Sequence, residues 1–463
     1  MKILYILSGL GVIAMLAEMF RFKKFLLPVV LAGMLGAMGC AVYDWNTDIH
    51  YYNNMLNFNN YALLFTCVIL GTAFLWFMMS GNFFKEETSR TDHFALILFA
   101  LCGAVILVSY SNMVMLFLGI EILSIPLYVL AGSKKDNLAS NESALKYFLM
   151  GAFASAILLF GIALLYGVFG TFDISMIKTY LSPPIPSQAR PSNAQWVLLS
   201  GGILFTLIGL GFKVSAVPFH FWAPDVYTGA PTQVTAFMAS IVKTAAFAAF
   251  LRIFICFAGV GQTWTNIIWG MAALTILLGN ITAVYQSNVK RMLAYSSISH
   301  AGYLLLAILA MNANSAGAIL YYVAAYSVST IGAFAVLTIL EKENEITFES
   351  FAGLAKRNPL LALAMCVAML SLSGIPPLAG FFGKYYIFTS ALSSGYIWLV
   401  LIAVLGSLIG VYYYFRVIIA MYLKETPDTS PIEVSLFQKI LLVITIISAL
   451  ALGIFPDLVI QLL

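Results

Sequence analysis

Long apolar runs separated by short polar segments cover almost the whole chain. Most are about 17 to 26 residues long, and a helix needs about 20 residues to cross a bilayer. The pattern therefore predicts an all-α integral membrane protein with about 14 transmembrane helices. The predicted spans lie near residues 3–20, 25–43, 61–80, 94–110, 113–131, 146–169, 194–214, 231–256, 262–284, 293–312, 315–340, 359–391, 397–423 and 436–461.

Two of these regions are interrupted by proline. The run 359–391 is too long for one span and contains Ser373-Gly-Ile-Pro-Pro377, so we interpret it as one discontinuous helix. The chain after residue 210 has a similar Ser-x-x-Pro break at Ser215 to Pro218. Paired broken helices are typical of transporters built from repeats, although proline also breaks helices for purely structural reasons.

The composition agrees with a membrane protein: 62% of the 463 residues are hydrophobic and 9% are charged, with a net charge of +4. This small excess gives no indication of nucleic-acid binding. Most loop lysines and arginines fall in one set of alternate loops, which predicts that both termini lie outside the cytoplasm. That set contains Arg21, Lys23, Lys24, Lys85, Arg90, Lys134, Lys135, Lys290, Arg291, Lys342, Lys356, Arg357 and Lys424, and the other contains Lys2, Lys178 and Arg190.

No cleavable targeting segment is evident, since basic residues follow the first apolar run without a small-residue cleavage site. We therefore expect a bacterial cytoplasmic membrane, or an organelle membrane.

Motifs for soluble chemistry are missing from the sequence. The cysteines stand singly within apolar runs, so they offer no ligand set for zinc or an iron–sulfur cluster. There is no phosphate loop, dinucleotide fingerprint or Ser/His/Asp set. We expect a chain that binds no cofactor or metal and moves a solute rather than transforming one.

Glu121 lies in the middle of the run 113–131, too deep for its short side chain to reach water. Pro126 removes the backbone donor for the carbonyl of Ile122, so a carboxylate and a free carbonyl lie together. This pairing predicts a buried water site. The alternative is a protonated glutamic acid that joins two helices.

Three lysines also lie within predicted spans, where a charge is costly and marks an ion path by default. Lys213 precedes the break at Pro218, Lys243 lies in the middle of 231–256, and Lys384 follows the break at Pro376. A charge pair between Glu121 and Lys213 could load and unload a proton. The alternative for each lysine is an aliphatic stem that reaches the membrane surface.

His300 follows several serines and a tyrosine, the groups that a proton wire needs. His220 lies in the first break and is a candidate entry residue. Lys146 begins its predicted span, and Arg252 and Arg416 lie toward span ends. The alternative is a buried, hydrogen-bonded structural role for His300, interfacial anchoring for His220 and snorkelling for Lys146. We assign Arg252 and Arg416 to snorkelling or structural pairing.

Four stretches of the sequence resemble a known family, the antiporter-like subunits of respiratory complex I. They are Phe212 to Pro231 with its Pro-Phe-His-Phe-Trp-Ala-Pro segment, Val242-Lys243, Lys290 to Tyr303, and Gly374-Ile-Pro-Pro-Leu-Ala-Gly-Phe-Phe-Gly-Lys384. The likeness extends over nearly the whole chain.

The resemblance implies two inverted five-helix repeats, each with a broken helix. The chain would divide into helices 1–3 (1–93), a first repeat (94–256), a second repeat (257–424) and a last helix (425–463). It also implies a proton relay in which Glu121 pairs with Lys213, Lys243 is the central bridge, His300 a link and Lys384 the terminal group, with Lys146 beside Glu121.

The resemblance further implies partners. We expect sister membrane subunits, with NADH, FMN, iron–sulfur clusters and quinone bound elsewhere in the complex. A multi-subunit sodium/proton antiporter resembles the same family and is the first alternative. A membrane scaffold without transport is the second.

Two loops are longer than the rest. We expect an irregular, Pro- and Ser-rich external lid over 171–191, and a surface helix, docking loop or solvated connector over 341–358.

Overall fold

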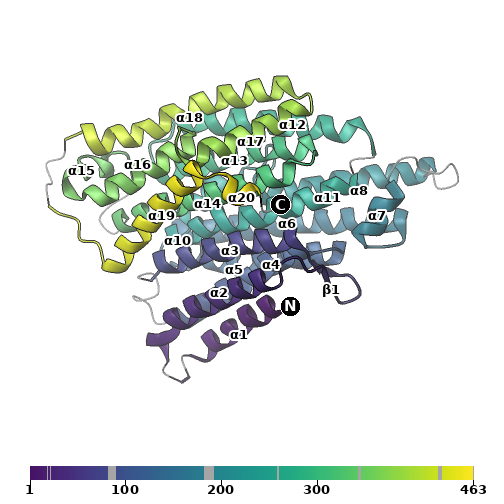
Figure 1. The fold of residues 1–463 in the computed structure, drawn as a ribbon, viewed down its shortest axis with the longest axis horizontal. Coiled ribbons are helices and arrows are strands. Elements are labelled where there is room, and N and C mark those ends of the chain that lie inside the picture. Colours follow the sequence, from purple (N-terminus) through teal and green to yellow (C-terminus); the bar gives the residue numbers. More distant parts are fainter. Residues whose placement is uncertain are drawn as a thin grey trace.

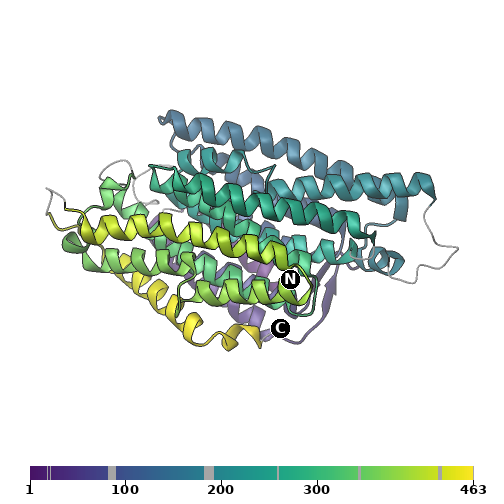
Figure 2. The ribbon, with the colours of Figure 1, turned by 90° about the horizontal axis from the view of Figure 1, so that it is seen from above.

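The computed structural model describes residues 1–17, 19–20, 22–81, 90–181, 192–257, 260–341, 346–425 and 430–461. Most of these residues form helices that run side by side along the long axis of the molecule (Figures 1 and 2). Both termini lie toward the end of the helices that carries strand β1.

Twelve helices in the described residues are long and apolar enough to cross a membrane. The stretch Thr232–Phe257, one of these twelve, comprises α10, a π-helical turn and α11. Lys2–Leu16 and Pro359–Ser373 are shorter apolar helices. Each apolar run predicted from the sequence contains at least one of these helices, so the helical membrane fold is confirmed.

The helices begin and end as follows: α1 (Lys2–Leu16), α2 (Leu26–Tyr43), α3 (Asn60–Met79), α4 (Arg90–Ser109), α5 (Met113–Ala131), α6 (Leu138–Phe169), α7 (Ile174–Leu181), α8 (Asn193–Lys213), α9 (Trp222–Gly229), α10 (Thr232–Phe237), α11 (Lys243–Phe257), α12 (Gln262–Val284), α13 (Val289–Ala310), α14 (Ser315–Leu340), α15 (Leu354–Arg357), α16 (Pro359–Ser373), α17 (Ala379–Ser393), α18 (Ile397–Leu423), α19 (Leu436–Ile454) and α20 (Asp457–Ile460).

The helices differ in how much of their surface the protein covers. The spans of α13 and α14 are each 94% buried inside the protein, whereas those of α2 and α19 are 28% buried. α13 and α14 pack against each other and against α17, and α14 also contacts α11. The centre of the bundle therefore lies along α11, α13 and α14.

Both predicted breaks are present. The first separates α8 from α9 and α10, and includes Ser215 with a φ of 60°. The second separates α16 from α17 at Gly374, whose φ of 85° favours glycine. Side chains replace some of the backbone bonds lost at the first break: the indole of Trp222 donates to the carbonyl of Phe212 at 3.0 Å.

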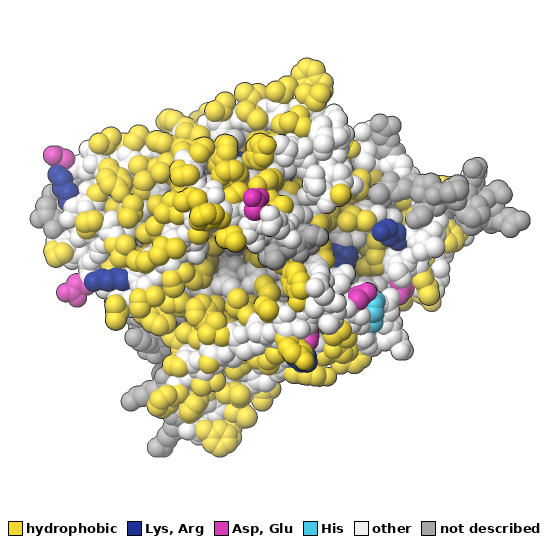
Figure 3. Space-filling view, in the orientation of Figure 1, with side chains coloured by type: hydrophobic (Ala, Val, Ile, Leu, Met, Phe, Trp, Pro, Cys, Tyr) yellow, Lys and Arg dark blue, Asp and Glu magenta, His cyan; other side chains and the backbone are white. Residues whose placement is uncertain are grey.

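The surface between the ends of the helices is mainly apolar. Figure 3 shows hydrophobic side chains over most of one face and few charged ones. Large exposed side chains such as Leu405, Leu408 and Tyr412 on α18 belong to this surface. An apolar surface of this extent fits contact with lipid or with other membrane subunits.

Four details differ from the sequence-based expectations. Ile49–Tyr51 and Leu56–Phe58 form a small antiparallel hairpin, β1 and β2. Helix α6 begins at Leu138 rather than near 146, because Asn137 caps it by accepting from the backbone N–H of Ser140 at 3.1 Å. The predicted last span, 436–461, ends at Ile454 and is followed by the separate short helix α20.

The fourth difference concerns the two long loops. The first half of the predicted lid is the regular helix α7, so the expectation of an irregular segment is wrong there; residues 182–191 lie outside the described part. The described part of 341–358 contains short helices with Phe351 and Leu354 buried, so it is packed rather than a solvated connector; residues 342–345 lie outside the described part.

Candidate functional site

Glu121 and Lys213 lie near each other where α5 meets the buried end of α8. The Lys213 ammonium donates to the Ser124 hydroxyl at 2.6 Å, and Glu121 is the acidic group that interacts with it electrostatically. They form no direct ion pair, and Oε1 of Glu121 is buried without a hydrogen-bond partner in the described chain. An unpaired buried carboxylate oxygen is costly, so this position favours a proton or a water molecule.

Ser124 couples the two groups through helix α5. Its hydroxyl accepts from Lys213 and donates to the carbonyl of Ile120. Pro126 lies within the same helix, as expected from the sequence. The Lys213 ammonium, the Ser124 hydroxyl and the Ile120 carbonyl thus form a chain of hydrogen bonds. Ser124 lies one helical turn from the Glu121 carboxylate.

Lys243 is the first residue of α11 and only 3% exposed. The π-helical turn Met238–Val242 immediately precedes it, and such turns are frequent at functional sites. Its ammonium donates to both the backbone carbonyl and the hydroxyl of Ser297 and lies 5.9 Å from the centre of the Tyr326 ring. All these partners are neutral, and no carboxylate of the described part of the chain forms an ion pair with Lys243.

Aromatic side chains pack beside Lys213. The ring of Tyr147 is 5.9 Å from the Lys213 ammonium, and its hydroxyl is buried without a hydrogen-bond partner in the described residues. Tyr147 stacks on Trp222 at 4.8 Å, and Trp222 packs edge-on against Tyr227 at 5.8 Å between ring centres. An aromatic cluster therefore encloses the first lysine on this side.

His300 lies one helical turn after Ser297 on α13 and is 4% exposed. Its Nδ1 shares a hydrogen bond with the Tyr322 hydroxyl at 2.5 Å, and its Nε2 with the Tyr414 hydroxyl at 3.0 Å. The Tyr414 hydroxyl also hydrogen-bonds to Ser296. Both ring nitrogens therefore have hydroxyl partners, as a proton relay needs.

Lys384 follows the second break and is 6% exposed. Its ammonium donates to the Ser373 carbonyl at 2.7 Å and to the Ser407 hydroxyl at 2.8 Å. A Cβ atom at Gly374 would lie 2.9 Å from Cδ of Lys384, so the glycine makes room for the lysine.

A small cavity adjoins His300 in the same region. It measures about 10 Å³, which is about the space that one water molecule needs. Hydroxyl groups line it at Tyr322, Tyr326, Ser329 and Ser371. A water here would have polar partners.

Two predicted residues are not joined to this chain of groups. His220 lies in the first break, buried against Phe221, and its Nδ1 has no hydrogen-bond partner among the described residues. Lys146 forms ion pairs with Glu142 and Asp225, each at 2.7 Å, instead of contacting Glu121.

Asp225 belongs to a cluster at the end of the bundle predicted to face the cytoplasm. Arg291 pairs with it at 3.1 Å, so residues from α6, α9 and α13 meet there. Burial would raise the pKa of Asp225, but the Lys146 and Arg291 charges outweigh burial and hold it below its usual value. The cluster therefore joins the segment after the first break to the helix that carries His300.

These features define a class: a polytopic membrane protein with two broken helices and buried ionisable groups, organised like an ion transporter. Residues 111–410 match the family described as NADH:quinone oxidoreductase/Mrp antiporter, transmembrane. The chain belongs to this family, and the resemblance seen in the sequence is confirmed.

Full-length relatives give a finer comparison. Subunit N of NADH-quinone oxidoreductase from Cytophaga hutchinsonii is 44% identical, over 100% of this chain and 99% of that protein. The same subunit from Flavobacterium psychrophilum is 42% identical over 100% of both.

Solved structures agree in fold. A chain in respiratory complex I from Thermus thermophilus has a TM-score of 0.85 and 33% identity, covering 100% of this chain and 99% of that one. A chain in the Mrp complex from Dietzia has a TM-score of 0.88 at 20% identity, covering 99% and 95%, which shows the shared fold.

The sequence singled out the serines before His300 as a group, but not the other hydroxyl and ionic partners of the predicted residues. Spacing gives a signal for Ser124, which follows Glu121 by one turn. Other partners come from distant segments. These are Tyr147, Tyr322, Tyr414 and Ser407, together with Asp225 and Arg291.

Proposed function

We propose that this chain is subunit N of a proton-translocating NADH:quinone oxidoreductase, and that its buried ionisable groups carry protons across the membrane. The observation that carries the proposal is the set of buried lysines and His300, each hydrogen-bonded to a hydroxyl group, in a chain that matches subunit N over its full length.

The proposed relay runs from Glu121 and Lys213 through Lys243 and His300 to Lys384. The hydroxyls of Ser124 and Ser297 support the first step, because each accepts from one of the two buried lysines. The hydroxyls beside His300 support the second. Lys146 and His220 lie at the edge of the proposed relay. Lys146 acts through its ion pairs, and His220 is an entry residue in the first break.

Charge changes along the row couple by Coulomb interaction. Two unit charges about 8 Å apart at an effective dielectric of about 20 interact by about 2 kcal/mol. When one lysine gains a proton, this repulsion therefore makes it less favourable for the next lysine to carry a charge. The energy for these changes comes from quinone reduction in partner subunits, which we expect to hold the FMN and iron–sulfur clusters and to bind NADH and quinone.

A sodium/proton antiporter subunit is the second candidate, favoured by the fold shared with the Mrp complex. A sodium site prefers several clustered oxygens, as other hard cations do. Within the described ranges, no group of three or more His, Cys, Asp or Glu residues could hold a metal ion. The lysine-rich row, with Glu121 as its single acidic member, supports proton transfer instead.

The test is purification of the tagged chain from its native membrane in mild detergent, followed by reconstitution into vesicles. We expect co-purification with flavin- and iron–sulfur-containing subunits, and NADH-driven proton transport that persists when choline replaces sodium. A colourless assembly, or transport that requires sodium, would contradict the proposal and support the antiporter.

A further inference from the structure

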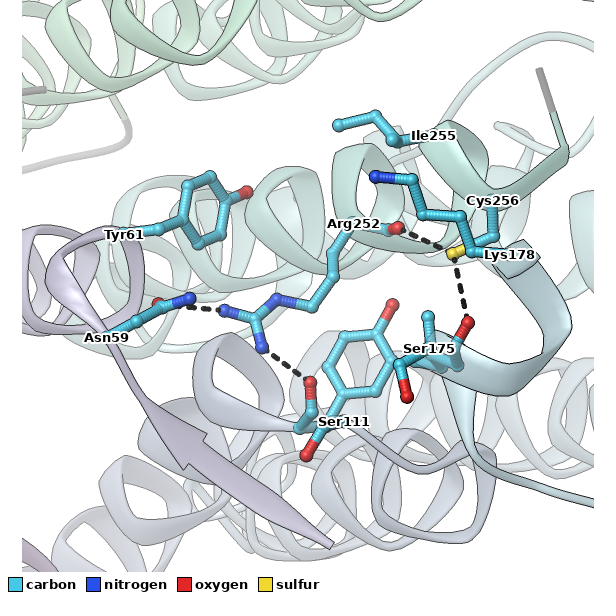
Figure 4. Close-up of a pocket in the computed structure, with 10 residues that line it drawn as sticks. Asn59, Tyr61, Ser111, Ser175, Lys178, Arg252, Ile255 and Cys256 are labelled. Carbon is cyan, nitrogen blue, oxygen red and sulfur yellow. Dashed lines mark hydrogen bonds between the residues drawn. The ribbon is translucent and has the colours of Figure 1, made fainter. Parts of the chain in front are cut away.

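A cavity of about 290 Å³ lies away from the relay, at the end of the bundle that carries the β-hairpin. It is formed where α3 begins and where α4 and α11 end, next to α7, and Figure 4 shows Arg252 and Lys178 among its lining residues. Ends of membrane-spanning helices lie at the level of lipid headgroups. Its volume is near the lower limit of small-molecule sites, about 300 Å³.

Arg252 is fixed in this cavity by neutral groups. One of its terminal nitrogens donates to the carbonyl of Tyr110 at 2.6 Å, and the other to Oδ1 of Asn59 at 3.4 Å. The guanidinium carbon lies 5.1 Å from the Tyr61 ring centre and 5.7 Å from that of Tyr110. An arginine near a helix end usually extends to water, whereas this one is held over the cavity.

The two aromatic rings are themselves held in place. The hydroxyls of Tyr61 and Tyr110 donate to the carbonyls of Ala248 and Ala249, each at 2.8 Å. Both carbonyls belong to α11, the helix that carries Arg252. The guanidinium is therefore positioned in advance, which reduces the entropy cost of binding a ligand.

The positive charge of Arg252 has no ion-pair partner among the described residues. Of the five guanidinium N–H groups, two are used by Tyr110 and Asn59. Two acidic groups at this end of the bundle have other partners: Asp173 accepts from Asn54 at 2.6 Å and from the backbone of Ser175 at 2.8 Å, and Asp48 lies 3.5 Å from His50. Lys178 adds a second positive charge from α7.

We propose that this cavity binds a phosphate group, either the headgroup of an anionic phospholipid or inorganic phosphate. The planar guanidinium of Arg252 presents its remaining donors to the phosphate oxygens. Lys178 adds charge at the exposed rim. Ile255, 39% exposed, gives an apolar wall beside the site that suits the start of an acyl chain.

The test measures lipid binding by native mass spectrometry of the purified full-length chain. Dioleoylphosphatidylglycerol is the probe, dioleoylglycerol is the matched lipid without phosphate, and inorganic phosphate is the competitor. We expect phosphatidylglycerol to bind in preference to dioleoylglycerol. Displacement by millimolar inorganic phosphate would identify free phosphate as the ligand, and resistance to displacement would identify the lipid.

Variants locate the site. Arg252→Gln should weaken phosphatidylglycerol binding by about tenfold because it removes a charge-assisted contact. Lys178→Gln, an exposed substitution that leaves the helix packing intact, should weaken it by about threefold. Lys424→Gln, an equally exposed lysine after α18, is the control and should bind like the parent chain.

Two results would overturn the proposal. One is equal binding of phosphatidylglycerol and dioleoylglycerol by the parent chain. The other is unchanged binding by Lys178→Gln together with unchanged binding by Arg252→Gln. If Arg252→Gln fails to fold, Lys178→Gln alone decides, and unchanged binding by that variant would show that Arg252 only ties the helix ends together.

Discussion

The two broken helices each place a lysine in the protein interior, but they surround it differently. Lys213 is the last residue before the first break and has Glu121 as an electrostatic partner. Lys384 comes after the second break and contacts the Ser373 carbonyl and the Ser407 hydroxyl, with no carboxylate of the described residues in contact.

The different surroundings of Lys213 and Lys384 indicate separate roles for the two lysines. A lysine with a nearby carboxylate can keep its charge at low cost, and it responds when that carboxylate moves or takes up a proton. A lysine with only neutral oxygen partners recovers less of the cost of burying its charge. The first half is thus suited to holding a charge, and the second half to releasing one.

A double-mutant cycle gives the largest expected contrast. We expect Glu121→Gln and Lys213→Met to be coupled by about 1–3 kcal/mol in proton transport by the assembled complex, since the two groups interact electrostatically and share Ser124 as a neighbour. Glu121→Gln and Lys384→Met should be additive within about 0.5 kcal/mol. Transport into vesicles measures both cycles, and equal coupling in the two would refute the division between halves.

Gly374→Ala tests the environment of Lys384 at the second break. The φ of 85° makes alanine costly there, by about 1–2 kcal/mol of stability. The new Cβ would also displace Lys384, so we expect transport to fall by about tenfold.

Gly395→Ala is the matched control for this prediction. Gly395 has a φ of 86°, and a Cβ there meets no atom within 4 Å. This variant should lower the melting temperature by a similar amount while transport stays normal. Normal transport in Gly374→Ala would show that the position of Lys384 is unimportant.

Removing one hydroxyl from each half should have a smaller effect. Ser124 is the hydrogen-bond acceptor for Lys213 in the described chain, whereas Lys384 keeps the Ser373 carbonyl when Ser407 is lost. Since a hydrogen bond to a charged group contributes about 1.5–3 kcal/mol, Ser124→Ala should slow transport by roughly tenfold and Ser407→Ala by less. The reverse order would contradict this account of the lysine environments.

The smallest expected effect is on stability rather than transport, and it concerns Asp225, which lies outside both lysine sites. Its folded pKa is depressed, so its ion pairs contribute stability above the ordinary pKa of about 3.9, and this is lost as the pH falls through the folded value. The side chain is 37% exposed, so solvent screening keeps the contribution small, at most about 1 kcal/mol.

The measurement is the melting temperature of the parent chain and of Asp225→Asn. We expect a constant difference between pH 8 and pH 5 that shrinks below about pH 4 and disappears once the pH has fallen through the folded pKa. A difference that grows on acidification would mean that Asp225 is protonated in the folded protein.

The apolar runs and the proline positions were enough to predict the helical membrane fold and both breaks. Burial of Lys213, Lys243 and Lys384 was also predictable, because each lies far from the ends of an apolar run or beside a break. These inferences depend on hydropathy, which can be read from each local stretch of sequence.

What surrounds these lysines could not be read in the same way. Ser297 holds Lys243, and Tyr414 contacts His300, but many serines and tyrosines occur in the apolar runs and only tertiary packing selects these two. The partner of Lys146 was missed because Asn137 starts α6 before its apolar part, which places Lys146 opposite Asp225.

The most direct test of the relay is the number of protons translocated per NADH by the assembled complex with Lys243→Met, with Lys424→Met as the control. We predict normal assembly and a lower ratio for Lys243→Met, and an unchanged ratio for Lys424→Met. A normal ratio in an assembled Lys243→Met complex would show that protons do not pass through Lys243 and that the chain acts as a scaffold.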